Sequence, residues 1–225
     1  MVESSNINAK KTLIFRNVYF SWSRDENAII KNCNFSIPQG GLWMLVGKNG
    51  CGKSTLLKLI KGVLQPNEGF IDRPLNLSLV FQNPDHQILM PTCGSELILN
   101  IREDLNSQDI YKKVKESLDA VGLNNFMKRP VQTLSGGQKQ RLAIASALIS
   151  KSNFILMDEP TALLDEFSQK QILEIIKSLI QDKKRSITVL WITHRLEELA
   201  YANKVAVMRN GTLSSWEDPK NLKYV

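Results

Sequence analysis

Long apolar runs and cysteine are both scarce in this sequence. No stretch approaches the roughly 18 consecutive apolar residues of a membrane-spanning helix, and the longest runs are as short as 154–157 and 189–192. The first 11 residues are polar and lack the apolar core of a signal peptide, so we expect a loose tail there. The three cysteines, Cys33, Cys51 and Cys93, have no paired spacing, which argues against a disulfide framework or a zinc site and favours a reducing compartment.

Basic residues outnumber acidic ones in a chain of otherwise ordinary composition. The 225 residues are 43% hydrophobic and 23% charged, as in globular proteins large enough to bury a core without disulfides. Lysine and arginine total 29 against 22 acidic residues, which gives a net charge of +7. That balance favours an anionic partner such as a nucleotide, a nucleic acid or a lipid headgroup, and a merely solubilising surface explains it equally well.

Strand patterns occupy both ends of the chain, where short apolar and β-branched segments are bounded by turn residues. We expect two strands joined by a polar turn within 12–36, and further strands or hairpins at 42–46, 77–81, 154–157, 187–192 and 204–216. A continuous apolar run such as 42–46 is typical of a strand that is buried on both faces. Strong turn formers at 65–69 predict a loop, and Asn210 with Gly211 predicts the turn of the last hairpin.

Helical periodicity replaces the strand patterns from about 84 to 150. The expected helices of the whole chain are 55–61, 109–121, 138–150, 166–181 and a short one at 195–201. Because strands and helices alternate outside the helical block, we expect an α/β fold with a largely parallel sheet. The prediction is one domain at 12–225, with a core of about 12–83 and 151–225 and an inserted helical subdomain of about 84–150.

A glycine-rich loop is the most specific feature. Residues 47–54 follow the pattern of glycine, four residues, glycine, lysine and serine, between a buried strand and a helix. In that setting the amides of Gly50, Gly52, Lys53 and Ser54 can form an anion nest at a helix N-terminus. Lys53 would add its charge at the β- and γ-phosphates, and the Ser54 hydroxyl suits Mg²⁺. The alternative is a chance glycine-rich turn, against which the strand before and the helix after both argue.

Two adjacent carboxylates follow the apolar strand at 154–157. Hydrolysis of a magnesium nucleotide needs an acidic group beside the metal and a group that orients or deprotonates water. Because side chains alternate along a strand, we expect Asp158 to face the metal and Glu159 to face the attacking water on the other side. A helix cap or a solvated acid is the alternative for Glu159. His194 follows another apolar strand and is a candidate for γ-phosphate contact, although a lone histidine is more often structural.

A further motif narrows the assignment. Residues 134–138 are Leu-Ser-Gly-Gly-Gln, and together with the loop at 47–54, the Asp158–Glu159 pair and His194 they resemble the ATP-binding-cassette (ABC) ATPases from about residue 13 to 216. The resemblance implies a P-loop NTPase with a RecA-like core, an N-terminal antiparallel β subdomain and an inserted α-helical subdomain. It also implies that the chain binds ATP and Mg²⁺ and hydrolyses ATP.

The resemblance assigns further residues one by one. Trp22 stands where the family has an aromatic that stacks on adenine, with Tyr19 and Phe20 as alternatives. Gln82 matches the glutamine that touches the metal and links the core to the helical subdomain, and Asp165 matches a loop that communicates across a dimer. The implied ATP contacts are Trp22, Gly47, Asn49, Gly50, Cys51, Gly52, Lys53, Ser54, Thr55 and Gln82. The implied metal shell is Ser54, Gln82 and Asp158, and the implied catalytic groups are Glu159, His194 and Lys53.

The signature motif implies that each nucleotide site is shared between two subunits. Ser135, Gly136, Gly137 and Gln138 match residues that close over the γ-phosphate of the other subunit's ATP. The two glycines let amides approach phosphate at the start of a helix that Gln138 is expected to open. Two chains would therefore sandwich two ATP molecules, and hydrolysis would depend on closure of the dimer.

A narrower resemblance concerns the segments 82–87 and 193–199, which look like those of the ATPase subunits of cobalt/nickel-type and energy-coupling-factor importers, including cyanobacterial and plastid relatives. It implies an importer of a metal ion or a vitamin, with an integral membrane subunit and a second ABC ATPase subunit, in a homo- or heterodimer, as partners. No specific nucleic acid is expected. The implied location is peripheral, on the cytoplasmic face of a membrane, in the cytosol or on the plastid stroma side.

Two other functions compete with the transporter. One is a non-transport ABC ATPase in iron–sulfur assembly or on nucleic acid, which the basic charge favours. Too few residues separate Ser54 from Ser135 for the long coiled coil of the chromosome and DNA-repair members, and the segment after Gln82 fits the importers better. The other is a nucleotide-binding regulator without hydrolysis, against which the presence of Glu159 and His194 argues.

Overall fold

The computed structural model describes residues 11–23, 27–182 and 185–222. Most of the expected tail at 1–11 therefore lies outside the described residues, and the first strand already begins at Lys11. Among the described residues, no helix combines the length and the apolar character needed to cross a bilayer.

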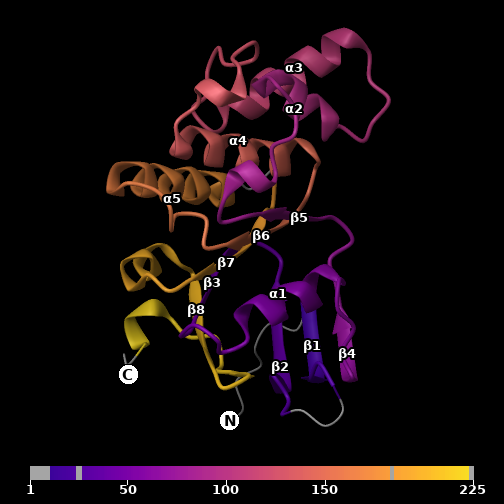
Figure 1. The fold of residues 1–225 in the computed structure, drawn as a ribbon, viewed down its shortest axis with the longest axis vertical. Helices are drawn as coiled ribbons and strands as arrows, with labels where there is room; N and C mark the ends of the chain where they lie inside the picture. Colours follow the sequence, from indigo (N-terminus) through magenta and orange to yellow (C-terminus); the bar gives the residue numbers. More distant parts are fainter. Residues whose placement is uncertain (1–10, 24–26, 183–184, 223–225) are drawn as a thin grey trace, which may run out of the picture.

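A small antiparallel sheet lies beside the first helix, as the resemblance predicts. Its strands are β1 (Lys11–Phe20), β2 (Ile30–Pro38) and β4 (Glu68–Asp72), paired in the order β2-β1-β4. Figure 1 shows it at the lower right, next to α1 (Lys53–Lys61). Phe15 and Ile37 of this sheet belong to the same buried cluster as Leu56 and Ile60 of α1, so the two elements share one core.

The main sheet is six-stranded and parallel except at one edge. In spatial order its strands are β5 (Leu77–Val80), β6 (Phe154–Asp158), β7 (Thr188–Thr193), β3 (Gly41–Val46), β8 (Lys204–Arg209) and β9 (Thr212–Leu213). Among the described strand pairs of this sheet, only β8–β9 is antiparallel. Val46 pairs with Thr193, and Asp158 pairs with Ile192. The carboxyl ends of β3, β6 and β7 therefore meet at one edge of the sheet, which is where ligands bind in such folds.

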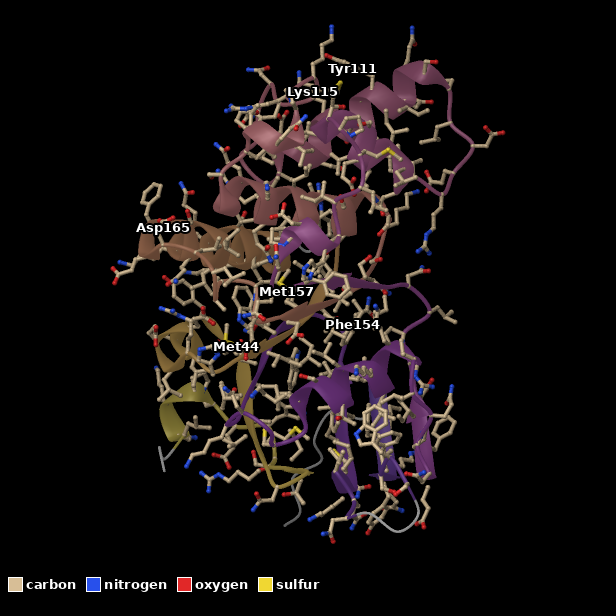
Figure 2. The ribbon with its side chains drawn as sticks, viewed as in Figure 1. Met44, Tyr111, Lys115, Phe154, Met157 and Asp165 are labelled. Atoms are coloured by element: carbon tan, nitrogen blue, oxygen red, sulfur yellow. The ribbon has the colours of Figure 1, made fainter. Side chains whose placement is uncertain are left out.

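Both faces of the main sheet are covered. Met44 and Met157 pack in a cluster with Ile172 and Ile176 of α5 (Glu166–Gln181). Their strand neighbours point the other way: Leu45, Phe154 and Leu156 pack with α1. Figure 2 labels Met44, Phe154 and Met157 in the middle of the molecule. The apolar runs that predict these strands are continuous because each strand supplies a core on both of its faces.

The helices above the sheet come from one stretch of the chain. Its elements are the 3₁₀ turn η1 (Pro84–His86), α2 (Cys93–Leu99), α3 (Ser107–Asp119), the 3₁₀ turn η2 (Val131–Thr133) and α4 (Gly136–Ile149). Figure 1 shows α2, α3 and α4 stacked above the sheet, away from the small antiparallel sheet. The chain ends its described part with two further 3₁₀ segments, η3 (Leu196–Tyr201) and η4 (Pro219–Asn221).

Local details differ from the sequence prediction at three elements. Strand β4 begins at Glu68, inside the segment predicted as a turn, and only Ile71 of its five residues is buried. The signature helix α4 begins at Gly136 rather than at Gln138, because Ser135 is its N-cap. The short helix expected at 195–201 is a 3₁₀ segment that starts one residue later. The first two differences share a cause, since exposed edge strands and caps carry no hydrophobic periodicity.

Candidate functional site

The loop at 47–52 joins β3 to α1 with two glycines in backbone conformations that suit only glycine. Gly50 has a φ of 78° and Gly52 a φ of 110°. A Cβ at Gly47 would lie 2.6 Å from the carbonyl oxygen of Met208, so that position also requires glycine. Because Gly52 is the N-cap of α1, no side chain of its own competes for the first backbone N–H groups of the helix. These N–H groups and the helix dipole are available to an anion.

Lys53 is held over this loop. It is 8% exposed, and its Nζ donates to the carbonyl oxygens of Gly47 at 2.7 Å and Lys48 at 3.1 Å. Ser54 is exposed at the first turn of α1, whereas Thr55 is buried. The ammonium and the Ser54 hydroxyl therefore lie at the start of the same helix, as phosphate and metal binding require.

Asp158 is the last residue of β6 and lies within electrostatic reach of Lys53. Burial raises the pKa of the Asp158 carboxyl, the negative charge of Glu159 raises it further, and Lys53 partly offsets both. A divalent cation at this carboxylate would favour its charged form. Among the described residues no cluster of three or more His, Cys, Asp or Glu side chains could hold a metal alone. One carboxylate with a hydroxyl and an amide nonetheless fits Mg²⁺, which usually takes its remaining oxygens from phosphates and water.

Glu159 and His194 face each other across two neighbouring strand ends. The Nδ1 atom of His194 lies 3.2 Å from Oε1 of Glu159. The Glu159 amide donates to the carbonyl oxygen of Ile192 at 2.9 Å, which ties the end of β6 to β7. Glu159 itself lies outside the strand, with a φ of 44°. The alternation of side chains along a strand therefore does not apply to Glu159, because the chain leaves the strand there in the left-handed region.

Trp22 is exposed beside α1. Its ring is 55% exposed, packs edge-on against Phe20 at 5.2 Å between centroids and has the Lys58 ammonium 5.5 Å from its own centroid. Phe20 is only 6% exposed and belongs to the core, and Tyr19 is half-buried on β1. Of these three aromatics, Trp22 is the one with the most surface available to a base.

The signature residues lie at the contact between α4 and α5. Ser135 caps α4: its Oγ accepts from the Gln138 amide at 3.3 Å, and its own amide donates to Gln138 Oε1 at 3.0 Å. Ser135 and Gly136 are exposed, and Gly137 is buried. A Cβ at Gly137 would lie 2.6 Å from Ser168 Oγ on α5, so the close approach of the two helices requires glycine there.

Asp165 connects the signature to the loop that follows Glu159. It is the N-cap of α5 and accepts from the amide and the hydroxyl of Ser168, at 2.9 and 2.8 Å. These two hydrogen bonds hold the pKa of the Asp165 carboxyl below its usual range. Figure 2 shows Asp165 at the outer end of α5. Ser168 thus packs on Gly137 and is also held by Asp165.

Gln82 is exposed just after β5, in a segment that two side chains of α4 hold. Gln140, which is fully buried, donates from Nε2 to the carbonyl oxygen of Phe81 at 2.9 Å. Lys139 forms an ion pair of 2.6 Å with Asp85. The signature helix α4 therefore contacts the chain just before Gln82, at Phe81, and just after it, at Asp85.

A cleft of about 640 Å³ opens beside the phosphate loop, and its volume lies in the usual range for small-molecule sites. Residues 47–51, including Asn49 and Cys51, form one wall, and His194 with Leu196 forms another. The carboxylates Asp158 and Glu159 do not line this cleft, so it adjoins the loop on the side of β8 rather than enclosing the whole site.

Sequence reasoning missed the residues that hold the site residues in place. Gln140 and Lys139 lie in a helix whose periodicity indicates only which face is buried, and Glu198 lies in a charged run that reads as solvated surface. Glu198 is in fact 2% exposed. One of its partners, Thr161, is 37 residues away in the sequence, so no local pattern could have indicated that contact.

Comparison with known proteins shows which family has this arrangement of residues. The family model described as "ABC transporter" matches residues 30–162. The ABC transporter I family member 10 of Arabidopsis thaliana is 47% identical over 203 residues, covering 87% of this chain and 74% of that relative. The chain belongs to the ABC transporter ATPase family. The predicted P-loop fold, the ATPase activity and the binding of ATP are thereby confirmed.

Other members of the ABC family match along nearly the whole chain. The energy-coupling factor transporter ATP-binding protein EcfA1 of Oceanobacillus iheyensis is 35% identical over 224 residues, covering 93% of this chain and 79% of that protein. The structure of CbiO1 from Clostridium perfringens, described as part of the ABC transporter complex CbiONQ, is 28% identical with a TM-score of 0.86, over 94% of this chain and 90% of that one. The cassette MJ0796, solved as a dimer with ADP and Pi, is 26% identical with a TM-score of 0.76, over 94% and 100%.

Proposed function

We propose that this ABC ATPase dimerises on ATP, hydrolyses it between the two subunits and energises a membrane transporter that imports a metal ion or a vitamin. The observation that carries the hydrolytic part is the 3.2 Å approach of Glu159 and His194 at the sheet edge where the phosphate loop begins. The signature residues Ser135 and Gly136 are exposed at the end of α4, so they are free to meet a second subunit. The dimeric state of the MJ0796 relative supports that arrangement.

In the proposed reaction, the Glu159 carboxylate orients a water molecule and accepts its proton as the water oxygen attacks the γ-phosphorus in line. The bond to the bridging oxygen breaks, and ADP leaves with that electron pair. Lys53 and His194 stabilise the charge of the transferring phosphoryl group. Mg²⁺ bound by Asp158, Ser54 and Gln82 would neutralise further phosphate charge. Trp22 would stack on the adenine.

The surface near Gln82 supports a membrane partner. Leu89, Ile98 and Leu99 are 76%, 48% and 51% exposed, and they lie after Gln82 and on α2. The Leu89 amide donates to Oε2 of Glu96 on α2 at 2.9 Å, so Leu89 lies beside that helix. Exposed large apolar side chains that lie near one another are typical of a protein interface. Lys139 and Gln140 join the Gln82 segment to the signature helix, so a partner helix on this surface would act on both halves of the ATP site.

The importer class rests on relatives. EcfA1 of Oceanobacillus iheyensis is described as an energy-coupling factor transporter subunit, and CbiO1 as part of a CbiONQ complex. From these relatives we infer that this chain also serves an importer of a vitamin or a metal ion. It would then lie at the cytoplasmic face of a membrane, in the cytosol or on the plastid stroma side.

Glu159→Gln tests the hydrolytic role. The amide keeps the shape and the contact distance but cannot accept the proton, so we expect turnover to fall by about 10²–10⁴-fold while ATP binding is retained. Phosphate release and nucleotide binding are both measured. Glu174→Gln, on the exposed face of α5, is the matched control and should keep normal turnover. Phosphate release at the wild-type rate by the Glu159 variant would refute the assignment.

Copurification tests the transporter role. In a gentle detergent extract we expect the chain to copurify with an integral membrane protein, and Leu99→Asp to lose that partner because a charge enters an apolar contact. Leu75→Asp is the control, because Leu75 is fully exposed on the β4–β5 connection, far along the chain from α2. Recovery of soluble partners alone, or of salt-sensitive nucleic acid, would contradict the transporter and favour a non-transport ABC ATPase.

A further inference from the structure

A buried carboxylate with no role assigned so far lies between the two loops that carry the proposed catalytic pair. Glu198, on η3, is 2% exposed. The indole Nε1 of Trp191 donates to its Oε2 at 3.0 Å, and the Thr161 hydroxyl donates to its Oε1 at short range. The Arg195 guanidinium lies 3.6 Å from Oε1. A buried polar group is costly unless it has partners, so two hydrogen-bond donors and a nearby guanidinium at one buried site indicate that the Glu198 carboxyl is held in one position.

The two donors and the guanidinium come from the two strand ends that position Glu159 and His194. Thr161 follows Glu159 by two residues, and it is 1% exposed. Arg195 directly follows His194, and Trp191 is fully buried in β7. Glu198 therefore connects the loop after β6 to the loop after β7, and anchors both to the buried part of β7.

His194 itself has little packing to fix it. Its side chain is 52% exposed, against 18% for Glu159. What holds the histidine is the backbone on either side of it. The Arg195 amide donates to Thr193 Oγ1 at 3.0 Å, and the Arg195 side chain is within ion-pair distance of the buried Glu198. The position of His194 relative to Glu159 thus depends on how the two loops are joined.

We infer that Glu198 is a positioning residue for ATP hydrolysis, which sets the separation of Glu159 and His194 by joining their loops through Thr161 and Arg195. The inference rests on the proposed roles of Glu159 and His194. Each of the two carboxylate oxygens accepts a hydrogen bond from a different element: Oε2 from Trp191 on β7, and Oε1 from Thr161 in the loop after β6. A glutamine has one acceptor oxygen. With that oxygen on Trp191, its amide nitrogen faces Thr161, whose hydroxyl must turn from donor to acceptor, and the Arg195 guanidinium loses its charged partner.

The test measures kcat and KM for ATP in the assembly in which the wild-type chain is active. We expect Glu198→Gln to lower kcat by about 10-fold or more, because small misplacements of reacting groups have large effects, while KM stays within about two-fold. Glu197→Gln is the matched control, since Glu197 is exposed and pairs with the same arginine. It should keep the wild-type kcat.

Thr161 gives a second test that does not change a buried charge. Thr161→Val removes the hydroxyl at nearly constant volume and should lower kcat as Glu198→Gln does, whereas Thr161→Ser keeps the hydroxyl and should retain kcat. The double variant Thr161→Val with Glu198→Gln should be no slower than the slower single variant, because both changes disrupt the same contact between Thr161 and Glu198.

Three results overturn the inference: a wild-type kcat in Glu198→Gln, a parallel change in kcat and KM, or equal losses in Thr161→Ser and Thr161→Val. If Glu198→Gln does not fold, the two Thr161 variants decide the question. Failure of the proposed function gives a different result, since Glu159→Gln would then turn over normally whatever the Glu198 variants do.

Discussion

Asp158 shows how the requirements of the site oppose those of stability. Burial and the neighbouring charge of Glu159 raise the pKa of its carboxyl, so ionisation of Asp158 is unfavourable in the folded protein without a cation. The folded state binds more protons than the unfolded state between the two pKa values. The contribution to stability is therefore complete below the unfolded pKa and is lost as the pH rises through the raised folded value.

Asp158→Asn should consequently stabilise the nucleotide-free protein at neutral pH and impair the enzyme. We expect a higher melting temperature than wild type at pH 7, a difference that disappears when the pH falls below the ordinary carboxyl range, and a loss of Mg²⁺-dependent turnover of about 100-fold or more. Thermal melts across pH and phosphate release are measured. A variant that is less stable at pH 7 yet fully active would contradict both parts.

At the scale of elements, the contact between α4 and α5 connects the signature to the Asp165 loop. Gly137 allows Ser168 to approach, and Asp165 holds Ser168 through its amide and hydroxyl. Any movement of the helical block that shifts α4 therefore reaches the loop that begins at Glu159. The contact is built from small residues, so its geometry is sensitive to a single methyl group.

Gly137→Ala should separate the two helices. The added Cβ would meet Ser168 Oγ at 2.6 Å and Ser168 Cβ at 2.8 Å, so we expect a destabilisation of about 1–3 kcal/mol and reduced ATPase activity. Ser168→Gly, which leaves the nearest remaining atom at 3.9 Å, should restore the activity of Gly137→Ala in the double variant. Gly136→Ala serves as control for folding, because its Cβ would make an ordinary contact with Leu164 at 3.5 Å. A double variant no better than Gly137→Ala would show that packing is not the cause.

Burial along a whole strand makes that strand easy to predict from the sequence. Strand β7 is buried at all six residues, and its apolar run predicts it. Strand β4 buries only Ile71, and its sequence therefore reads as a turn. The motifs predict which residues gather at the site, but the positive φ of Glu159 and the burial of Glu198 depend on residues far away in the sequence. Such features require the folded structure.

At the scale of the whole molecule, the two halves of the proposed site lie on different parts of one chain. The phosphate loop opens α1, which packs on one face of the main sheet. The signature lies where α4 meets α5, and α5 packs on the other face. Figure 1 shows α1 and α5 on opposite sides of the strands. A loop and a signature that belong to one ATP are thus expected to come from two chains.

Subunit mixing tests this claim most directly. Glu159→Gln disables the site built on a chain's own phosphate loop, and Ser135→Arg disables the site that the chain completes in its partner. Each variant alone should be inactive. When the two are mixed under conditions in which they form ATP-dependent dimers with each other, each mixed dimer holds one intact site, so turnover should recover to about one quarter of the wild-type rate. Mixed dimers that form and remain inactive would contradict the account.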